Sequence, residues 1–301
     1  MHKNMSVNLA GVSLKNPIVT ASGTLGGMEY SPFVDLNRLG AITVKGVSHE
    51  PWEGNPPHRI VETYGGMLNA VGLQNPSAKV FIAEELPLLR KFDTKIFVNI
   101  CGRNMEDYIA VIEDFNGVDI DIFELNISCP NIKAGGLAIG TDPKAAEAVT
   151  KAVVARAKAP VIVKLSPNVT DIVSIAKACE AGGAAGISLI NSVLGMKIDI
   201  HKKKPLLGNT IGGLSGPAIK PIAVRMVYQV AKNIKLPILG MGGIMTWEDA
   251  IEFIMAGATA VAVGMANFTN PHVTIDILEG IEAYMDKEGI SDINQIRGIA
   301  Q

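Results

Sequence analysis

Thiol, amide and ammonium side chains occur in this chain where short apolar runs give way to loops. The clearest case is LNISCPNIKAGG at 125–136, in which Cys129 stands between an apolar run and a loop with paired glycines. A buried cysteine usually behaves as a small apolar side chain. The start of a loop is instead where binding and catalytic groups concentrate. The position of Cys129 therefore suits a reactive group better than a packing group.

Cysteine usage limits the kinds of site that the chain can carry. Its three cysteines are Cys101, Cys129 and Cys179. Three thiols in a chain of this length do not make a disulfide framework, and their spacing matches no CxxC metal pair. They also fall short of the four thiolates that an iron-sulfur cluster usually takes. We expect no metal site, and a cluster that exchanges electrons with this protein must belong to another chain.

The composition is that of a globular protein. The chain has 301 residues, of which 48% are hydrophobic and 19% charged, and its formal net charge is -2. This balance gives no reason to expect nucleic acid, and the basic run HKKK at 201–204 is short enough for a solvated loop. The N-terminus has no signal-peptide run, and no segment approaches the ~20 apolar residues of a membrane helix. We expect a cytoplasmic protein without membrane contact.

Short apolar runs alternate with amphipathic stretches along the sequence. Runs that are apolar almost throughout are typical of parallel strands covered on both faces. The expected strands lie at 16–22, 41–48, 95–102, 121–129, 160–167, 184–192, 236–244 and 258–266. Helices are expected at 142–158, 171–183 and 246–258, with N-cap candidates at Thr141 or Asp142, Thr170 or Asp171, and Thr246.

Roughly eight strand-helix units in a chain of about 250 residues or more predict a TIM (β/α)8 barrel. A doubly wound sheet is the alternative, but SGTLGG at 22–27 has the wrong spacing for its nucleotide-binding turn. We therefore expect an α/β TIM barrel that forms one domain over residues 1–301. The alternating opening at 7–17, which turns at Ala10 and Gly11, predicts an N-terminal β-hairpin.

The barrel predicts where the functional groups meet, because active sites in this fold lie where strands end and βα loops begin. The expected strand ends carry Ser22, Lys45, Asn99, Asn126, Cys129, Lys164, Asn191, Ser192, Gly242, Gly243 and Gly264. Two connections, 49–76 and 193–216, are longer than usual βα loops and are expected to cover or wall the site. Within the first, GMLNAVGLQNP at 66–76 combines glycines with amides, which suits a small ligand, although an ordinary turn cluster has the same composition.

The last two units indicate a phosphate site. GMGGIMTWEDA at 240–250 and VGMANF at 263–268 follow the seventh and eighth expected strands. Barrels often hold a phosphate at this place with backbone amides and a helix N-terminus. A phosphate-bearing cofactor together with two lysines on one rim indicates a flavin enzyme, a pyridoxal enzyme or a Schiff-base aldolase.

Several segments together resemble the catalytic subunit of class 1 dihydroorotate dehydrogenases. They are KGVSHEPWEGNPPHRI, GMLNAVGLQNP, ELNISCPNIKAGG, VIVKLSPN, INSVLGMKID, GGLSGPAIKP and GMGGI, and they follow the family order over nearly the whole chain. NAVGLQNP and GGLSGPAIKP resemble class 1B most. The resemblance implies a TIM barrel with one flavin mononucleotide (FMN) per chain, which oxidises (S)-dihydroorotate to orotate in pyrimidine biosynthesis.

The resemblance also implies roles for individual residues. Cys129 matches the general base that takes the C5 proton, a role that a thiol with an ordinary pKa near ~8.5 can fill. Lys45 matches a catalytic lysine near flavin and substrate, and Lys164 a lysine at the flavin pyrimidine edge. Substrate-binding positions are Lys45, Asn69, Ala70, Val71, Gly72, Leu73, Asn126, Asn131, Asn191 and Ser192. Flavin-binding positions are Ser22, Lys45, Gly46, Asn99, Asn126, Lys164, Ile190, Gly216, Gly242, Gly243, Gly264 and Met265, the last in place of an expected threonine or similar residue.

Class 1B membership implies a second subunit. That subunit carries FAD and an iron-sulfur cluster and passes electrons to NAD, in a heterotetramer of two catalytic and two electron-transfer subunits built on a homodimer of catalytic chains. Class 1A, a dimeric fumarate-dependent enzyme, is an alternative, as is the related dihydropyrimidine dehydrogenase module. Two hypotheses come from other functional classes. One is a Schiff-base aldolase that uses Lys164, and the other is a barrel without catalytic function.

Overall fold

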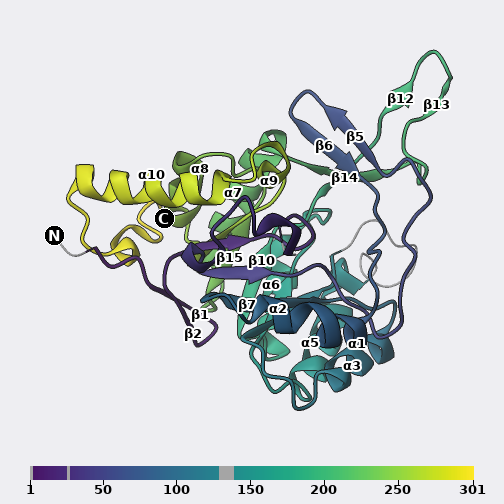
Figure 1. The fold of residues 1–301 in the computed structure, drawn as a ribbon, viewed down its shortest axis with the longest axis horizontal. Coiled ribbons are helices and arrows are strands. Elements are labelled where there is room, and N and C mark those ends of the chain that lie inside the picture. Colours follow the sequence, from purple (N-terminus) through teal and green to yellow (C-terminus); the bar gives the residue numbers. More distant parts are fainter. Residues whose placement is uncertain (1–2, 26–27, 129–138) are drawn as a thin grey trace.

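Eight parallel strands close into a barrel in the computed structural model of this chain, which describes residues 3–25, 28–128 and 139–301 (Figure 1). The strands are β3 (Ile18–Thr20), β4 (Ala41–Thr43), β7 (Lys95–Ile100), β8 (Ile122–Asn126), β9 (Val161–Lys164), β10 (Gly186–Leu189), β15 (Ile238–Met241) and β16 (Ala260–Val263). Each lies within one of the eight apolar runs, and they neighbour one another in chain order until β16 closes on β3. The predicted TIM barrel is confirmed.

Burial explains why these short runs form strands. All residues of β3, β4, β8, β9, β10, β15 and β16 are buried. Parallel strands in a barrel face its packed interior on one side and the surrounding helices on the other, so both sets of alternating side chains are apolar. Polar exceptions occur, such as Glu124 inside β8, and those at the carboxyl ends, Asn126 and Lys164, mark the rim.

Helices follow most of the strands. They are α3 (Met105–Asp114), α5 (Pro143–Val154), α6 (Ile172–Ala181), α7 (Lys220–Ala231), α8 (Trp247–Met255), α9 (Ala266–Thr269) and α10 (Val273–Glu288). The three predicted helices correspond to α5, α6 and α8, and Asp142, Asp171 and Thr246 act as their N-caps. None of the helices formed by the described residues has the length and apolar character that a membrane crossing requires.

Two crossovers depart from the regular strand-helix pattern. Between β3 and β4 the described residues form two 3-10 turns, Met28–Tyr30 and Leu36–Arg38, rather than an α-helix. Between β4 and β7 a helical segment joins α1 (Ala78–Val80), a π-helical turn (Phe81–Glu85) and α2 (Leu86–Leu89). These irregular segments still bury Leu36, Phe81 and Leu86 in the core.

The predicted N-terminal hairpin is present. Strands β1 (Val7–Leu9) and β2 (Val12–Leu14) pair antiparallel and turn at Ala10 and Gly11. The Gly11 N–H donates to Asn8 Oδ1 at 3.0 Å, which closes the turn. Leu9 and Leu14 are fully buried in the main core, so the hairpin packs against the barrel.

The two long loops build a second sheet that the sequence analysis did not anticipate. Residues 49–76 contain β5 (Ile60–Thr63) and β6 (Gly66–Asn69), and residues 193–216 contain β11 (Val193–Gly195) and β14 (Gly212–Ser215). They form a four-stranded antiparallel sheet in the order β11-β14-β6-β5. Glycine allows the close approach of β6 to β14, since a Cβ on Gly66 would lie 1.9 Å from the carbonyl oxygen of Ser215.

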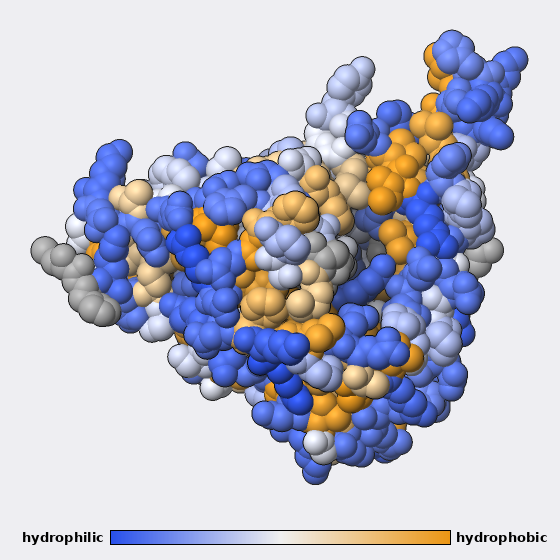
Figure 2. Space-filling model, viewed as in Figure 1, coloured by the Kyte–Doolittle hydropathy of each residue, from blue (hydrophilic) through white to orange (hydrophobic). Residues whose placement is uncertain are grey.

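This sheet projects from one side of the barrel, with the hairpin β12 (Ile198–Asp199) and β13 (Lys204–Pro205) extending beyond it (Figure 1). Apolar residues lie near the base of the projection, and its tip is mostly hydrophilic (Figure 2). Exposed apolar side chains on these segments include Ile60, Leu194, Met196, Ile198, Ile200 and Ile211. The projection thus adds a second wall above the barrel rim.

Candidate active site

A cavity lies between the carboxyl ends of the barrel strands and the second sheet. Most of the residues predicted for the site line it together: Ser22, Lys45, Gly46, Asn69, Val71, Gly72, Leu73, Asn126, Lys164, Ile190, Asn191, Ser192, Gly216, Gly242, Gly243, Gly264 and Met265. Segments that are far apart in the sequence therefore converge on one space, although their individual roles stay predictions.

Four predicted residues are placed elsewhere or are not described. Ala70 and Asn99 are fully buried behind the cavity wall rather than part of it. Cys129 and Asn131 lie outside the described residues. The described chain before this gap ends at Ser128, which is fully buried beside the cavity.

Lys164 stands at the centre of the rim. It ends β9 and pairs in register with Asn126, which ends β8. Lys164 is 5% exposed, and its ammonium donates to Ser22 Oγ at 3.2 Å. Its Nζ also lies 3.6 Å from Oε2 of Glu124, one pleat below Asn126. A lysine at the end of an apolar strand needs such polar partners, because an unpaired buried charge is costly.

A chain of hydrogen bonds fixes the amides of the cavity. Asn99 Nδ2 donates to Glu124 Oε2 at 2.6 Å, and Asn126 Nδ2 donates to Asn99 Oδ1 at 3.3 Å. Asn126 Oδ1 in turn accepts from the backbone N–H of Ser128 at 3.2 Å and from its hydroxyl at 3.0 Å. Every donor in this series points toward Glu124, so the amide groups of Asn99 and Asn126 have one defined orientation.

The same chain continues to the other side of the cavity. Asn191 Nδ2 donates to Ser128 Oγ at 2.9 Å, while Asn191 Oδ1 accepts from the backbone N–H of Ser192 at 2.7 Å. An amide nitrogen carries two hydrogens. Within the described part of the chain, Asn126 and Asn191 each use one N–H in this network, so each keeps a second donor. With Lys45 and Lys164, they make this edge of the cavity rich in hydrogen-bond donors, which suits a ligand with carboxylate or carbonyl oxygens.

The loop after β6 forms the facing wall. Asn69 donates from Nδ2 to the Gly213 carbonyl at 3.3 Å, and Val71 accepts from the backbone N–H of Asn55 at 3.0 Å. Gly72 packs closely on Asn55, whose backbone nitrogen would lie 2.7 Å from an added Cβ. These contacts hold the loop 69–73 in place, so the wall is formed before a ligand binds.

Two glycines open a cradle at the opposite end of the cavity. Gly216 and Gly243 have φ of 110° and 82°, in the region that other residues adopt with strain. An added Cβ on Gly243 would lie 2.7 Å from the Gly216 carbonyl oxygen and 2.9 Å from the Lys220 nitrogen. Close backbone approach without side chains is what a phosphate group requires. The residues at this end of the cavity therefore fit a phosphate group, as a phosphate-bearing flavin would offer.

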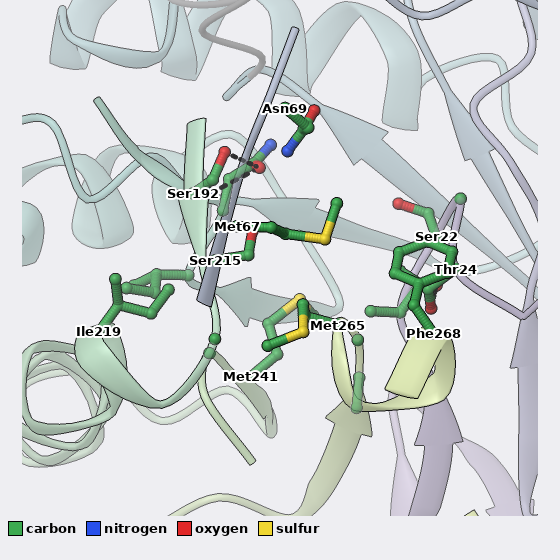
Figure 3. A pocket seen from close by; sticks show the side chains of 18 of the residues that line it. Ser22, Thr24, Met67, Asn69, Ser192, Ser215, Ile219, Met241, Met265 and Phe268 are labelled. Carbon is green, nitrogen blue, oxygen red and sulfur yellow. Dashed lines mark hydrogen bonds between the residues drawn. The ribbon is translucent and has the colours of Figure 1, made fainter. Parts of the chain in front are cut away.

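Four apolar side chains meet in the cavity, of which only Met265 was predicted from the sequence. Met67, Met241, Met265 and Phe268 line the middle of the cavity, with Met67 on the second sheet and Phe268 on α9 (Figure 3). Methionine adapts to flat aromatic surfaces. Met265, which stands where a threonine or similar residue was expected, packs against Gly216: its methyl group would lie 2.7 Å from a Cβ added there. Met241 and Phe268 could have been predicted, because they stand at or just after the carboxyl ends of barrel strands. Met67 could not, because it reaches the cavity only through the second sheet, which the spacing of residues does not reveal.

The described cysteines are poor candidates for chemistry. Cys101 and Cys179 are free thiols and both are fully buried. Burial raises the pKa of the Cys179 thiol to about 12, with a smaller opposing effect of a hydrogen bond from Thr150. A thiol with so high a pKa is protonated at neutral pH and unreactive. Cys129 is thus the remaining cysteine for a reactive role.

Comparisons with known proteins agree with this geometry. A family model described as "Dihydroorotate dehydrogenase" matches residues 4–285. The chain is 64% identical over 296 residues to a protein of Alkaliphilus metalliredigens named "Dihydroorotate dehydrogenase B (NAD(+)), catalytic subunit", covering 98% of each chain. A protein of the same name from Desulforamulus reducens is 53% identical over 302 residues, covering 100% of this chain and 99% of its own. On these matches the chain belongs to the dihydroorotate dehydrogenase family, among the NAD-linked B-type catalytic subunits.

Proposed function

We propose that this chain oxidises (S)-dihydroorotate to orotate in pyrimidine biosynthesis, as the catalytic subunit of an NAD-linked class 1B enzyme. The observation that carries the proposal is the donor-rich edge formed by Lys164, Asn126 and Asn191, set against the glycine cradle at Gly216 and Gly243. Orotate has a carboxylate and two ring carbonyls, which are the acceptors that such an edge binds. The cradle fits the phosphate of the flavin that the family implies.

The cofactor in this proposal is one FMN per chain, held by the whole of residues 1–301 as a single flavin-binding domain. Ser22, Gly46, Ile190, Gly242 and Gly264 contribute to the same cavity wall as Lys164. Bound FMN supplies the acceptor for the hydride that leaves C6 of dihydroorotate. The Lys164 ammonium favours this transfer, because a fixed cation stabilises negative charge that develops beside it.

Substrate binding is assigned to both walls. Asn126, Asn191 and Ser192 meet the ligand from the barrel, and Asn69 with the loop 70–73 meets it from the second sheet. The ligand then lies between two surfaces whose hydrogen bonds are in place beforehand. Such preorganisation fixes the orientation of C5 and C6 before any bond breaks.

Proton transfer is assigned to Cys129, with Lys45 as a second catalytic group on the cavity wall. Cys129 follows Ser128 directly in the sequence, and Ser128 is held by both Asn126 and Asn191. A thiolate at this position takes the C5 proton as the C6 hydride departs, which leaves the double bond of orotate. Asn131, two residues further on, is the last predicted substrate contact.

The relatives' name "catalytic subunit" implies a partner. In the proposed complex, two catalytic chains form a homodimer, and two electron-transfer subunits with FAD and an iron-sulfur cluster complete a heterotetramer. The partner would take up the electrons of the oxidation and deliver them to NAD. The short supply of cysteines in this chain agrees with a cluster carried elsewhere.

Anaerobic reduction of the purified protein tests the activity. The protein should be yellow, release FMN on denaturation, and lose its flavin absorbance when dihydroorotate is added. Dihydrouracil lacks the carboxylate and should bleach the flavin much more slowly. Faster bleaching by dihydrouracil would instead support the dihydropyrimidine dehydrogenase alternative, and a colourless protein would overturn the proposal.

A further inference from the structure

One buried carboxylate holds two groups of the active site at once. Glu124 is 1% exposed and lies on β8, one pleat below Asn126. Its Oε2 accepts from Asn99 Nδ2 at 2.6 Å and lies 3.6 Å from Lys164 Nζ. It does not line the cavity. Glu124 therefore does not contact a ligand in the cavity, and its contacts with the site are those to Asn99 and Lys164.

The register of the barrel places Glu124 between these partners. Asn99 on β7 is the direct neighbour of Glu124 on β8, and Lys164 on β9 pairs with Asn126, two residues further along β8. All three side chains reach the barrel interior, where a charge is screened far less than in water. The Lys164 ammonium thus has its counter-charge on the side away from the cavity.

A carboxylate is also the one side chain here that can only accept hydrogen bonds. Asn99 must turn its NH2 group to Glu124, which leaves Asn99 Oδ1 for Asn126 Nδ2. Glu124 is therefore the terminal acceptor of the hydrogen-bond chain that orients the cavity amides. Removing its charge weakens both the anchor of Lys164 and that of Asn99.

We propose that Glu124 is a positioning residue that holds Lys164 and Asn99 and thereby sets how much positive charge the flavin senses. The proposal rests on the flavin that the family implies, and goes beyond the proposed function in assigning a role to a residue outside the cavity. Among the described residues, Glu124 is the one carboxylate that forms an ion pair with Lys164, so its neutralisation leaves the ammonium without a paired carboxylate. A less compensated cation favours the reduced, negatively charged flavin.

The test is the midpoint potential of the bound flavin in Glu124→Gln, measured with a mediator dye on the flavin-loaded protein. The substitution keeps shape and removes charge, so a role in packing alone would change the unfolding temperature but not the potential. We expect the potential to rise. An unchanged or lower potential overturns the proposal. Because the dye replaces dihydroorotate, this readout does not depend on the substrate; failure of dihydroorotate to bleach the wild-type flavin would overturn the proposed function instead.

Two further variants keep the result interpretable. Asp114→Asn neutralises another carboxylate, which is largely buried, pairs with His49 and Lys79 and does not line the cavity, and it should leave the potential at the wild-type value. Glu124→Asp keeps the negative charge but shortens the side chain by one methylene, which moves the charge away from Lys164. The flavin potential in Glu124→Asp should therefore rise by less than the potential in Glu124→Gln. If Glu124→Gln does not retain flavin, Glu124→Asp decides alone, and a wild-type potential there overturns the proposal.

Discussion

Asn126 and Lys164 stand side by side at the barrel rim because the register of β8 and β9 pairs them directly. Within the described part of the chain, the Asn126 amide donates one N–H to Asn99 and keeps the other for a ligand oxygen, while Lys164 is a buried lysine. A single strand pairing thus brings a neutral donor and a cation to the same side of one cavity.

Replacement of the proposed base separates binding from chemistry. We expect Cys129→Ala to retain FMN, since the flavin contacts proposed above lie on other residues, and to lose rapid bleaching by dihydroorotate, by about 100-fold or more. Stopped-flow absorbance under anaerobic conditions measures the rate. Cys179→Ala is the matched control, because that thiol is buried away from the cavity, and it should bleach at the wild-type rate. A wild-type rate in Cys129→Ala would refute the base assignment.

Removal of the buried cation should cost stability as well as activity. Lys164→Met leaves the carboxylate of Glu124 buried without its cation, and breaking such a pair typically costs about 3–5 kcal/mol. We expect a clear drop in the unfolding temperature of the flavin-free protein. The double variant Lys164→Met with Glu124→Gln has no unpaired charge and should recover part of the loss. Equal unfolding temperatures for the single and double variants would show that the pair contributes nothing.

A single added methyl group tests whether the glycine cradle must stay open for the flavin phosphate. In Gly243→Ala the new Cβ would meet backbone atoms of Gly216 and Lys220, and φ is 82°. We expect the dissociation constant of FMN to rise about tenfold or more, as measured by fluorescence of released flavin. Gly117→Ala is the control, with φ of 79° and no atom within 4 Å, so it shares the backbone strain without the crowding. Equal flavin affinity in the two variants would contradict a phosphate site at Gly243.

The pH dependence of unfolding should report the buried thiol of Cys179. Burial raises its pKa from an ordinary value of 9.0 to about 12. Between these values the unfolded chain has lost a proton that the folded chain keeps, so the stability from this group is fully present below pH 9.0 and falls as pH rises. The free energy of unfolding of wild type relative to Cys179→Ala should drop by roughly 1 kcal/mol between about pH 9.5 and about pH 10.5. Urea unfolding with a reductant present measures this, and parallel pH curves would contradict it.

Electron transfer to NAD should require the partner subunit. The described chain alone offers two buried cysteines, and no group of three or more described His, Cys, Asp or Glu side chains could hold a metal ion. We expect the purified chain to reduce artificial dyes with dihydroorotate but not NAD. Addition of an electron-transfer subunit that carries FAD and an iron-sulfur cluster should restore NAD reduction. Rapid NAD reduction by the isolated chain would count against the class 1B assignment.

The barrel was predictable because its signal is local. Each strand is a short apolar run that is buried on both faces, and N-caps such as Asp142 and Thr246 mark where helices begin. The rim residues followed from the fold, since a strand end in a barrel has a known direction. Resemblance to a family then supplied roles that residue types alone leave open.

The second sheet and the inner network were not predictable in the same way. β6 and β14 are separated by about 140 residues, and their pairing depends on backbone contacts such as Gly213 opposite Asn69 rather than on periodicity. Glu124 stood in the motif ELN, but nothing in its spacing showed that it contacts Asn99 and Lys164 from below. Asn99 supports Asn126 from behind the cavity wall, a contact that the sequence did not reveal, and its contact with flavin stays a prediction.

The pairing of β6 with β14 couples the positions of two segments that are predicted to bind different ligands. Asn69, on β6, and Gly216, directly after β14, both line the cavity, and they are predicted to contact the substrate and the cofactor, respectively. A shift of one strand must displace the other, because Met67 and Ser215 are register partners. We therefore expect flavin binding at one end of the cavity to change the affinity for substrate at the other, through this strand pairing.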